Sequence, residues 1–256
     1  MIRSGMASVT FRDLAPAEIV DVSRRAGLEA IEWGGDVHVP HGDLERAREV
    51  GALTRGAGLE VASYGSYYRA GCRGGDFPSF DEVLETALAL DAPAIRLWAG
   101  ERGPADAGPH WWTTVVNDTR QIAGLSSEAG VPIAFEFHGH TLTDSAESAE
   151  RLMRQVDHPN VSCYWQLDRT LTPAERLAGL RRVAPWLANL HVFYYRGDQQ
   201  AALAEGADEW RQYLGLAAAQ GGDRYALLEF VEGGLPENLE RDAATLVDLL
   251  AELQGA

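Results

Sequence analysis

The chain has 256 residues, of which 46% are hydrophobic, and carries a formal net charge of −16. This negative field repels nucleic acid and is compatible with a small neutral substrate or a cation. No apolar run approaches the roughly 20 residues needed to span a bilayer, so we expect neither a nucleic-acid nor a membrane partner.

The N-terminal segment and the cysteines bear on the compartment. The first residues, MIRSGMASVTFRD, contain no apolar stretch after Arg3, so we expect no signal peptide. Cys72 and Cys163 lie far apart, which favours a reducing compartment and argues against a cysteine-based zinc site. We therefore expect a cytoplasmic protein, and the sequence leaves a homo-oligomer open.

Short apolar segments with many strand-forming residues alternate with longer amphipathic segments along the whole chain. The predicted strands are 8–11, 28–33, 59–65, 94–99, 133–138, 161–166, 189–194 and 225–230. The segments between them have helical spacing, and Gly27, Gly58 and Gly130 mark helix ends. Eight such units in a chain of about 250 residues predict an α/β fold, a single (β/α)8 TIM barrel over residues 1–256.

The rival arrangement is a doubly wound open sheet. Such a sheet normally carries a glycine-rich phosphate-binding loop after its first strand. The corresponding segment here, FRDLAP, is nothing of the kind, and the chain contains no GxGxxG or Walker sequence. The barrel is therefore favoured.

Polar residues stand at the ends of four consecutive predicted strands. In VPIAFEFHGH, residues 131–140, Glu136 and His138 share a face because side chains alternate along a strand. Gln166, His191 and Glu229 belong to the next three predicted strands. The carboxyl ends of barrel strands carry the active site in this architecture, so we expect these side chains to meet there.

Buried carboxylates are costly unless something positive compensates them. Two carboxylates, one imidazole and one amide oxygen are ligands that suit Mn²⁺, Mg²⁺, Co²⁺ or Zn²⁺. Taken singly, a buried histidine or a strand-end glutamate is usually a hydrogen-bonded or ion-paired structural residue. Their joint occurrence predicts one divalent metal ion bound by Glu136, Gln166, His191 and Glu229.

Several stretches resemble the sugar phosphate isomerase/epimerase superfamily with a xylose-isomerase-like TIM barrel. They are GLEAIEWGGDVHVPHGD, AIRLWAG, FEFHGHTLTD, HPNVSCYWQ, NLHVF and LLEF. Members similar to tagatose and psicose 3-epimerases bind one metal through Glu, Asp, His and Glu. Those positions correspond to Glu136, Gln166, His191 and Glu229. Gln166 thus departs from the family's Asp, and Arg169 stands where the ketose epimerases have His.

The resemblance implies a metal-dependent isomerase or epimerase acting on a sugar or keto-sugar. In that chemistry Glu136 and Glu229 also act as acid and base, removing and returning a proton beside the carbonyl through an enediolate. We expect His138 to donate a hydrogen bond to a substrate oxygen, as a third catalytic residue.

Further side chains are candidates for substrate binding, each with plain packing or a surface ion pair as the alternative. They are Glu32, His38, Trp98, Trp112, Arg169 and Arg196. The long connections at 65–79 and 100–112 are expected to bound the cavity, because loops of this length are uncommon unless functional.

Two alternatives remain open from the sequence. An inosose-type dehydratase uses the same proton abstraction followed by loss of a β-hydroxyl group. A non-catalytic metal- or sugar-binding protein would need the metal ligands but not two potential bases. The retention of both glutamates favours an enzyme.

Overall fold

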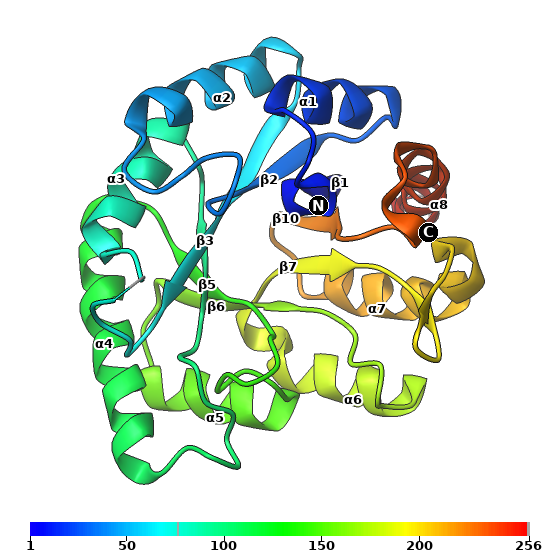
Figure 1. Cartoon of the computed structure of the whole chain (residues 1–256). Coiled ribbons are helices and arrows are strands. Elements are labelled where there is room, and N and C mark those ends of the chain that lie inside the picture. The colour runs from blue at the N-terminus through cyan, green and yellow to red at the C-terminus, as the bar shows by residue number, and fades with distance from the viewer. Residues whose placement is uncertain (76, 255–256) are drawn as a thin grey trace.

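The structure, a computed structural model, describes residues 1–75 and 77–254. In these residues eight parallel strands close into a barrel in the order β1-β10-β7-β6-β5-β4-β3-β2. Figure 1 shows the helices surrounding the strands. The predicted (β/α)8 barrel is confirmed. Within the described part of the chain, every helix is too short or too polar to cross a membrane.

Seven barrel strands have three to six residues and β3 has ten, all within the usual range for strands. They are β1 (Ile2–Ala7), β2 (Ala30–Gly34), β3 (Glu60–Arg69), β4 (Ile95–Trp98), β5 (Ile133–Phe135), β6 (Val161–Trp165), β7 (Leu187–Val192) and β10 (Arg224–Leu228). A small antiparallel hairpin, β8 (Tyr195–Arg196) and β9 (Gln199–Gln200), follows β7.

The helices pack around the barrel with their apolar faces inward. They are α1 (Pro16–Arg25), α2 (Leu44–Gly56), α3 (Phe80–Leu90), α4 (Pro109–Glu128), α5 (Ala146–Val156), α6 (Pro173–Val183), α7 (Ala207–Ala219) and α8 (Pro236–Gln254). Short 3₁₀ turns are η1 (Ser8–Phe11), η2 (Ala184–Trp186), η3 (Leu203–Gly206) and η4 (Glu232–Gly234).

Local sequence explains where several helices begin and end. Ser79 and Thr172 accept hydrogen bonds from the first-turn amides of α3 and α6, each paired with a glutamate three residues later. Gly27, Gly58 and Gly130 follow α1, α2 and α4 with φ of 71°, 79° and 74°. A residue with a Cβ rarely adopts this conformation, which is why glycine ends these helices.

The predicted position of the first strand, residues 8–11, is wrong. Residues 8–11 form η1, whereas the strand is Ile2–Ala7, IRSGMA, which lacks the apolar composition of the others. Gly5 lets β1 approach β2 closely, because a Cβ there would lie 2.6 Å from the Ala30 carbonyl oxygen. Backbone pairing therefore defines this strand, and the more strand-like segment that follows it turns over the mouth of the barrel.

Three barrel strands end just before the polar residue predicted to lie at their tip. Glu136, Gln166 and Glu229 directly follow β5, β6 and β10, while His191 lies within β7. Alternation places Glu32 on the same face as Ala30, which belongs to a small buried cluster with Ala62, Ala134, Tyr164 and Leu227. These polar groups therefore lie together at the carboxyl end of the barrel.

Candidate metal and catalytic site

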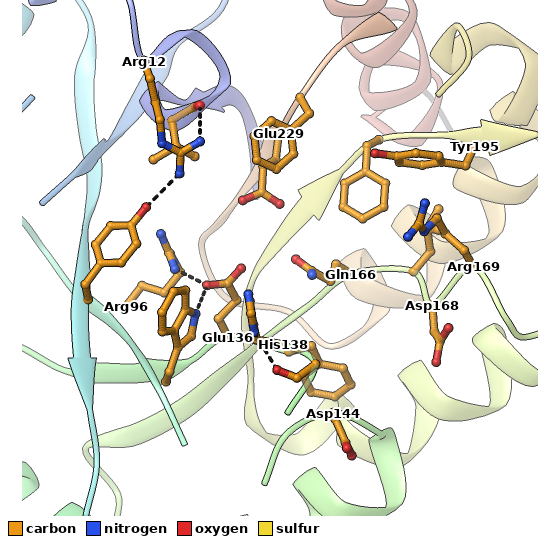
Figure 2. Close-up of a pocket in the computed structure, with 18 residues that line it drawn as sticks. Arg12, Arg96, Glu136, His138, Asp144, Gln166, Asp168, Arg169, Tyr195 and Glu229 are labelled. Atoms are coloured by element: carbon orange, nitrogen blue, oxygen red, sulfur yellow. Dashed lines mark hydrogen bonds and ion pairs between the residues drawn. The ribbon is translucent and has the colours of Figure 1, made fainter. Parts of the chain in front are cut away.

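A cavity of about 500 Å³ opens at the carboxyl ends of the barrel strands (Figure 2). Its lining includes Trp98, Glu136, Gln166 and Glu229, which follow or end β4, β5, β6 and β10. Figure 2 shows the side chains of Glu136, Gln166 and Glu229 converging from different strands on one space. The cavity has the size of small-molecule sites in proteins.

His191 lies at the centre of the polar cluster and is fully buried. Its Nδ1 is 3.0 Å from Gln166 Oε1, 3.2 Å from Glu229 Oε2 and 3.6 Å from Glu136 Oε1. Single donor atoms of Glu136, His191 and Glu229 all lie within 4.8 Å of one another. The structure therefore brings together all four side chains predicted as metal ligands.

The other face of His191 meets Glu32. Nε2 lies 3.4 Å from Glu32 Oε1, and Glu32 also accepts hydrogen bonds from Ser63 Oγ at 2.6 Å and Arg96 Nε at 2.7 Å. Burial alone would lower the pKa of His191, but the carboxylates of Glu229 and Glu32 raise that pKa well above its usual value. Glu32 therefore sits beneath the cavity and orients the imidazole ring.

Glu136 has one oxygen occupied by two donors. Its Oε2 accepts hydrogen bonds from Arg96 Nη1 and from Trp98 Nε1, the latter at 2.6 Å. Burial would raise the pKa of Glu136, but the Arg96 guanidinium outweighs it and holds that pKa well below its usual range. Only Oε1 is left to face His191.

Glu229 is presented to the cavity by a strained turn. The next residue, Phe230, has a φ of 58°, which is rare for a bulky side chain. Its amide donates to Thr10 Oγ1 at 3.0 Å, so η1 holds the turn, while the Glu229 amide donates to the Val192 carbonyl at 3.0 Å. Figure 2 shows the Glu229 carboxylate directed into the cavity.

Three further predicted residues also line the cavity. The ring of His138 packs on that of Trp98 with centroids 4.5 Å apart, and its Nδ1 is 2.8 Å from the Gly139 carbonyl. The Arg169 guanidinium lies over the Tyr195 ring, 4.6 Å from its centroid. His138, Trp98 and Arg169 therefore stand where a substrate would contact them.

The structure places four predicted substrate-binding residues away from the cavity. Glu32 is buried beneath it, and His38 is held by Ser8 and Leu14. Trp112 lies on α4, 3% exposed, under the Arg151 guanidinium. Arg196 is exposed and pairs with Glu205 at 3.0 Å. Of the described residues in the two long loops, only Tyr67 lines the cavity, and it belongs to the extended β3.

Sequence reasoning missed several cavity residues. They are Arg12, Tyr67, Arg96 and Asp144. Arg96 was detectable, because an arginine inside the apolar strand AIRLW requires buried carboxylates, here Glu32 and Glu136. The others lie on loops or at the end of an unexpectedly long strand, so strand alternation gave no sign of them.

The donor set fits a divalent metal ion. His191 Nδ1 faces two carboxylates and an amide oxygen, while Nε2 lies 3.4 Å from Glu32 Oε1 without a hydrogen bond in the described part of the structure. A neutral imidazole nitrogen with three oxygens is a combination that Mn²⁺, Mg²⁺, Co²⁺ and Zn²⁺ accept. Glu32 supplies the outer carboxylate that commonly supports a metal-bound histidine.

The fold and the site together define a (β/α)8 barrel with a candidate metal site at the end where such barrels carry their active sites. The family described as xylose isomerase-like TIM barrel matches residues 20–192, and the chain belongs to it. This confirms the resemblance seen in the sequence.

Individual relatives are more distant. The chain is 25% identical over 207 residues to 3-dehydroshikimate dehydratase of Bacillus anthracis, covering 74% of this chain and 71% of that one. A crystal structure of a probable 3-DHS dehydratase from Bacillus anthracis matches with a TM-score of 0.76 and 20% identity, covering 96% and 99% of the two chains.

Two other solved structures share the fold. D-Psicose 3-epimerase of Clostridium cellulolyticum H10 has a TM-score of 0.71 at 15% identity, covering 98% of this chain and 99% of that one. A xylose isomerase-like TIM barrel protein of Mycobacterium smegmatis, in complex with magnesium, has a TM-score of 0.75 at 15% identity, covering 99% and 98%.

Proposed function

We propose that the chain is a divalent-metal-dependent enzyme that removes a proton beside a carbonyl group of a small hydroxylated substrate. The observation that carries this proposal is the convergence of Glu136, Gln166 and Glu229 oxygens on His191 Nδ1 at the cavity. A divalent ion held by these four residues would polarise the carbonyl and stabilise the negative charge that develops as the proton leaves.

Glu229 is the side chain best placed to take the proton. Its Oε2 faces His191, whereas Oε1 has no hydrogen-bond or ion-pair partner among the described residues. A general base needs an oxygen that is free to approach the substrate. The carboxylate lines the cavity and points into it (Figure 2).

Glu136 is a poor second base. Oε2 already accepts two hydrogen bonds and Oε1 faces the metal ligands. A proton arriving on Oε2 would have to displace Arg96 or Trp98. This arrangement supports a role for Glu136 as ligand, and it favours chemistry with one carboxylate base over the two-base epimerisation expected from the sequence.

Loss of water is the outcome that we propose first. Glu229 would remove the proton from the α-carbon, a carbon–carbon double bond would form, and the β-hydroxyl group would leave with a proton from His138. Both side chains line the same cavity. The 25% identity to a dehydratase supports this reaction class.

Isomerisation of a sugar or keto-sugar is the second candidate. It needs a single base that returns the proton to the neighbouring carbon, so Glu229 alone suffices. The observation that favours it is that two more carboxylates, Asp144 and Asp168, belong to the cavity lining. A sugar's hydroxyl groups would donate hydrogen bonds to them, at Asp168 through the oxygen that Thr170 leaves free.

Arg169 points to an anionic group on the substrate. It lines the cavity, and within the described residues no carboxylate lies within ion-pairing distance of its guanidinium. Arginine binds carboxylates and phosphates through paired hydrogen bonds. A hydroxylated keto acid or a sugar phosphate would satisfy this group.

The test is to incubate the Mn²⁺-loaded protein in D₂O with keto-sugars, inososes and cyclic hydroxy-keto acids. A dehydratase gives a product lighter by one water, whereas an isomerase gives a product of unchanged skeleton with deuterium at carbon. The chelator-treated protein is the control. If no compound exchanges its α-proton or loses water, the proposal is contradicted, and a binding protein without catalysis becomes the better account.

A further inference from the structure

We infer that Trp98 is a positioning residue that fixes which oxygen of Glu136 faces the metal site. Its indole Nε1 donates to Glu136 Oε2 at 2.6 Å, a short hydrogen bond to a buried carboxylate. The oxygen that approaches His191 Nδ1 is the other one, Oε1, at 3.6 Å, so Oε1 is left as the Glu136 atom that can bind the metal. The inference rests on the metal site of the proposed function.

The indole is itself held in place by neighbours around its ring. The Arg69 guanidinium lies over it, 4.2 Å from the centroid, and the two residues pair across β3 and β4. The Tyr67 ring meets it edge-on at 5.1 Å, and the His138 ring packs on it at 4.5 Å. A ring held by these contacts has little freedom to turn, so the direction of its N–H is fixed.

Arg96 does not make this hydrogen bond redundant. Its guanidinium is shared, because Nε donates to Glu32 while Nη1 donates to Glu136. A carboxylate held only at Nη1 can still rotate and present either oxygen. The Trp98 N–H approaches the same oxygen from β4's last residue, and two donors on one oxygen fix the carboxylate plane.

The first test compares Trp98→Phe with Trp111→Phe. Phenylalanine keeps an aromatic ring for Arg69 but lacks the N–H. Trp111 is a matched control: the Arg102 guanidinium lies 4.9 Å from its ring centroid, and its buried Nε1 has no partner among the described residues.

Titration calorimetry with Mn²⁺ alone should show about 10- to 100-fold weaker binding for Trp98→Phe, the range for residues that support metal ligands. Trp111→Phe should bind like the parent protein. Equal affinities for all three proteins would overturn the inference, as would equal losses in the two variants.

A second readout needs no metal. In the ¹⁵N-labelled, metal-free protein, Glu136→Gln should move the indole N–H resonance of Trp98, because a charged acceptor becomes neutral, and should leave that of Trp111 in place. An unmoved Trp98 resonance would overturn the inference by showing that the hydrogen bond is absent.

The two proposals fail in different ways. If Glu136→Gln loses Mn²⁺ but Trp98→Phe does not, the positioning role is overturned and the metal site stands. If the parent protein binds no Mn²⁺, the proposed function fails and the role of Trp98 toward a metal fails with it. We expect two results. The Trp98 indole resonance should move in Glu136→Gln, and of the two tryptophan variants only Trp98→Phe should bind Mn²⁺ more weakly than the parent protein.

Discussion

Glu136 and Glu229 are the same residue type at equivalent strand ends, yet their carboxylates have different neighbours. Arg96 and Trp98 both donate to one oxygen of Glu136. Glu229 meets only the imidazole of His191 among the described residues. Under the proposed function, the environment rather than the residue type makes Glu136 a metal ligand only and leaves Glu229 able both to bind the metal and to take a proton.

The two Glu→Gln variants should consequently differ. Glu229→Gln keeps an oxygen donor and removes the base, so turnover of the metal-replete variant should fall by about 10²–10⁴-fold. Glu136→Gln should chiefly weaken Mn²⁺ binding, and excess Mn²⁺ should restore part of its turnover. Rates must be measured together with metal content by elemental analysis. A metal-replete Glu229→Gln variant with near-parental turnover would show that Glu229 is only a ligand.

Gln166 allows a test of the ligand set by gain instead of loss. The amide oxygen of Gln166 lies 3.0 Å from His191 Nδ1. Gln166→Asp replaces this neutral oxygen donor with a charged one. We expect Mn²⁺ affinity to rise about tenfold or more, equivalent to ~1.4 kcal/mol or more. Calorimetry with Mn²⁺ measures it, and Gln166→Asn, a shorter neutral side chain, is the control. Unchanged affinity in the Asp variant would remove Gln166 from the ligand set.

At the scale of elements, the loops after β1 and β2 support each other through His38. Its ring nitrogens lie 3.0 Å from Ser8 Oγ and 3.2 Å from the Leu14 carbonyl oxygen. Donation to Leu14 places the proton on Nε2, so in the neutral ring Nδ1 accepts from the Ser8 hydroxyl. Burial lowers the pKa of His38, which favours this neutral form in the folded protein.

The linkage gives a definite pH dependence. Because the pKa of His38 is lower in the folded state than the usual 6.5, its contribution to stability is complete above pH 6.5. That contribution is lost as the pH falls from 6.5 through the folded pKa. Urea unfolding from pH 7.5 to 5 should therefore show a smaller decline in stability for His38→Gln than for the parent protein.

The His38→Gln variant should still lose some stability at low pH, because burial also lowers the pKa of His41. The control variant therefore replaces a histidine outside both loops. His110→Gln, at an exposed position on α4, should leave the decline unchanged. A parental decline in His38→Gln would mean that the loops accommodate the charged ring.

At the scale of the whole molecule, metal binding should stabilise the fold, because the ligands come from strands that are distant in sequence. A ligand at 100 times its Kd adds about 2.7 kcal/mol if it binds only the folded state. For a chain of this size that should raise Tm by roughly 5–10 °C. Scanning calorimetry with Mn²⁺ or with chelator measures it, and His191→Ala should abolish the difference. Identical Tm values for the parent protein would contradict the metal site.

The proximity of the four candidate ligands was predictable, because barrel geometry brings consecutive strand ends together. Glu136, Gln166, His191 and Glu229 each follow or end an apolar segment, so alternation alone brings them together. The first strand was not predictable, since IRSGMA has no apolar alternation and is defined by pairing with β2 and β10.

The surroundings of the site depend on contacts that spacing does not encode. His38 is turned away by hydrogen bonds to a neighbouring loop, and Trp112 by packing of α4 against the core. Arg12 reaches the cavity through hydrogen bonds to Asp36 at 2.8 Å and to Tyr67 at 3.0 Å. The positions of these side chains depend on tertiary contacts, so the sequence pattern alone could not predict them.

The guanidinium of Arg96 also determines the electroneutrality of the site. Glu32, Glu136 and Glu229 are three carboxylates around His191, and Arg96 neutralises one of their charges. Two negative charges are left, which a divalent ion matches when His191 is neutral. With aspartate at position 166 the loaded site would keep a negative charge that repels an enolate. If the site holds a divalent ion and the substrate forms an enolate as proposed, glutamine at this position keeps the loaded site neutral and spares the enolate that repulsion.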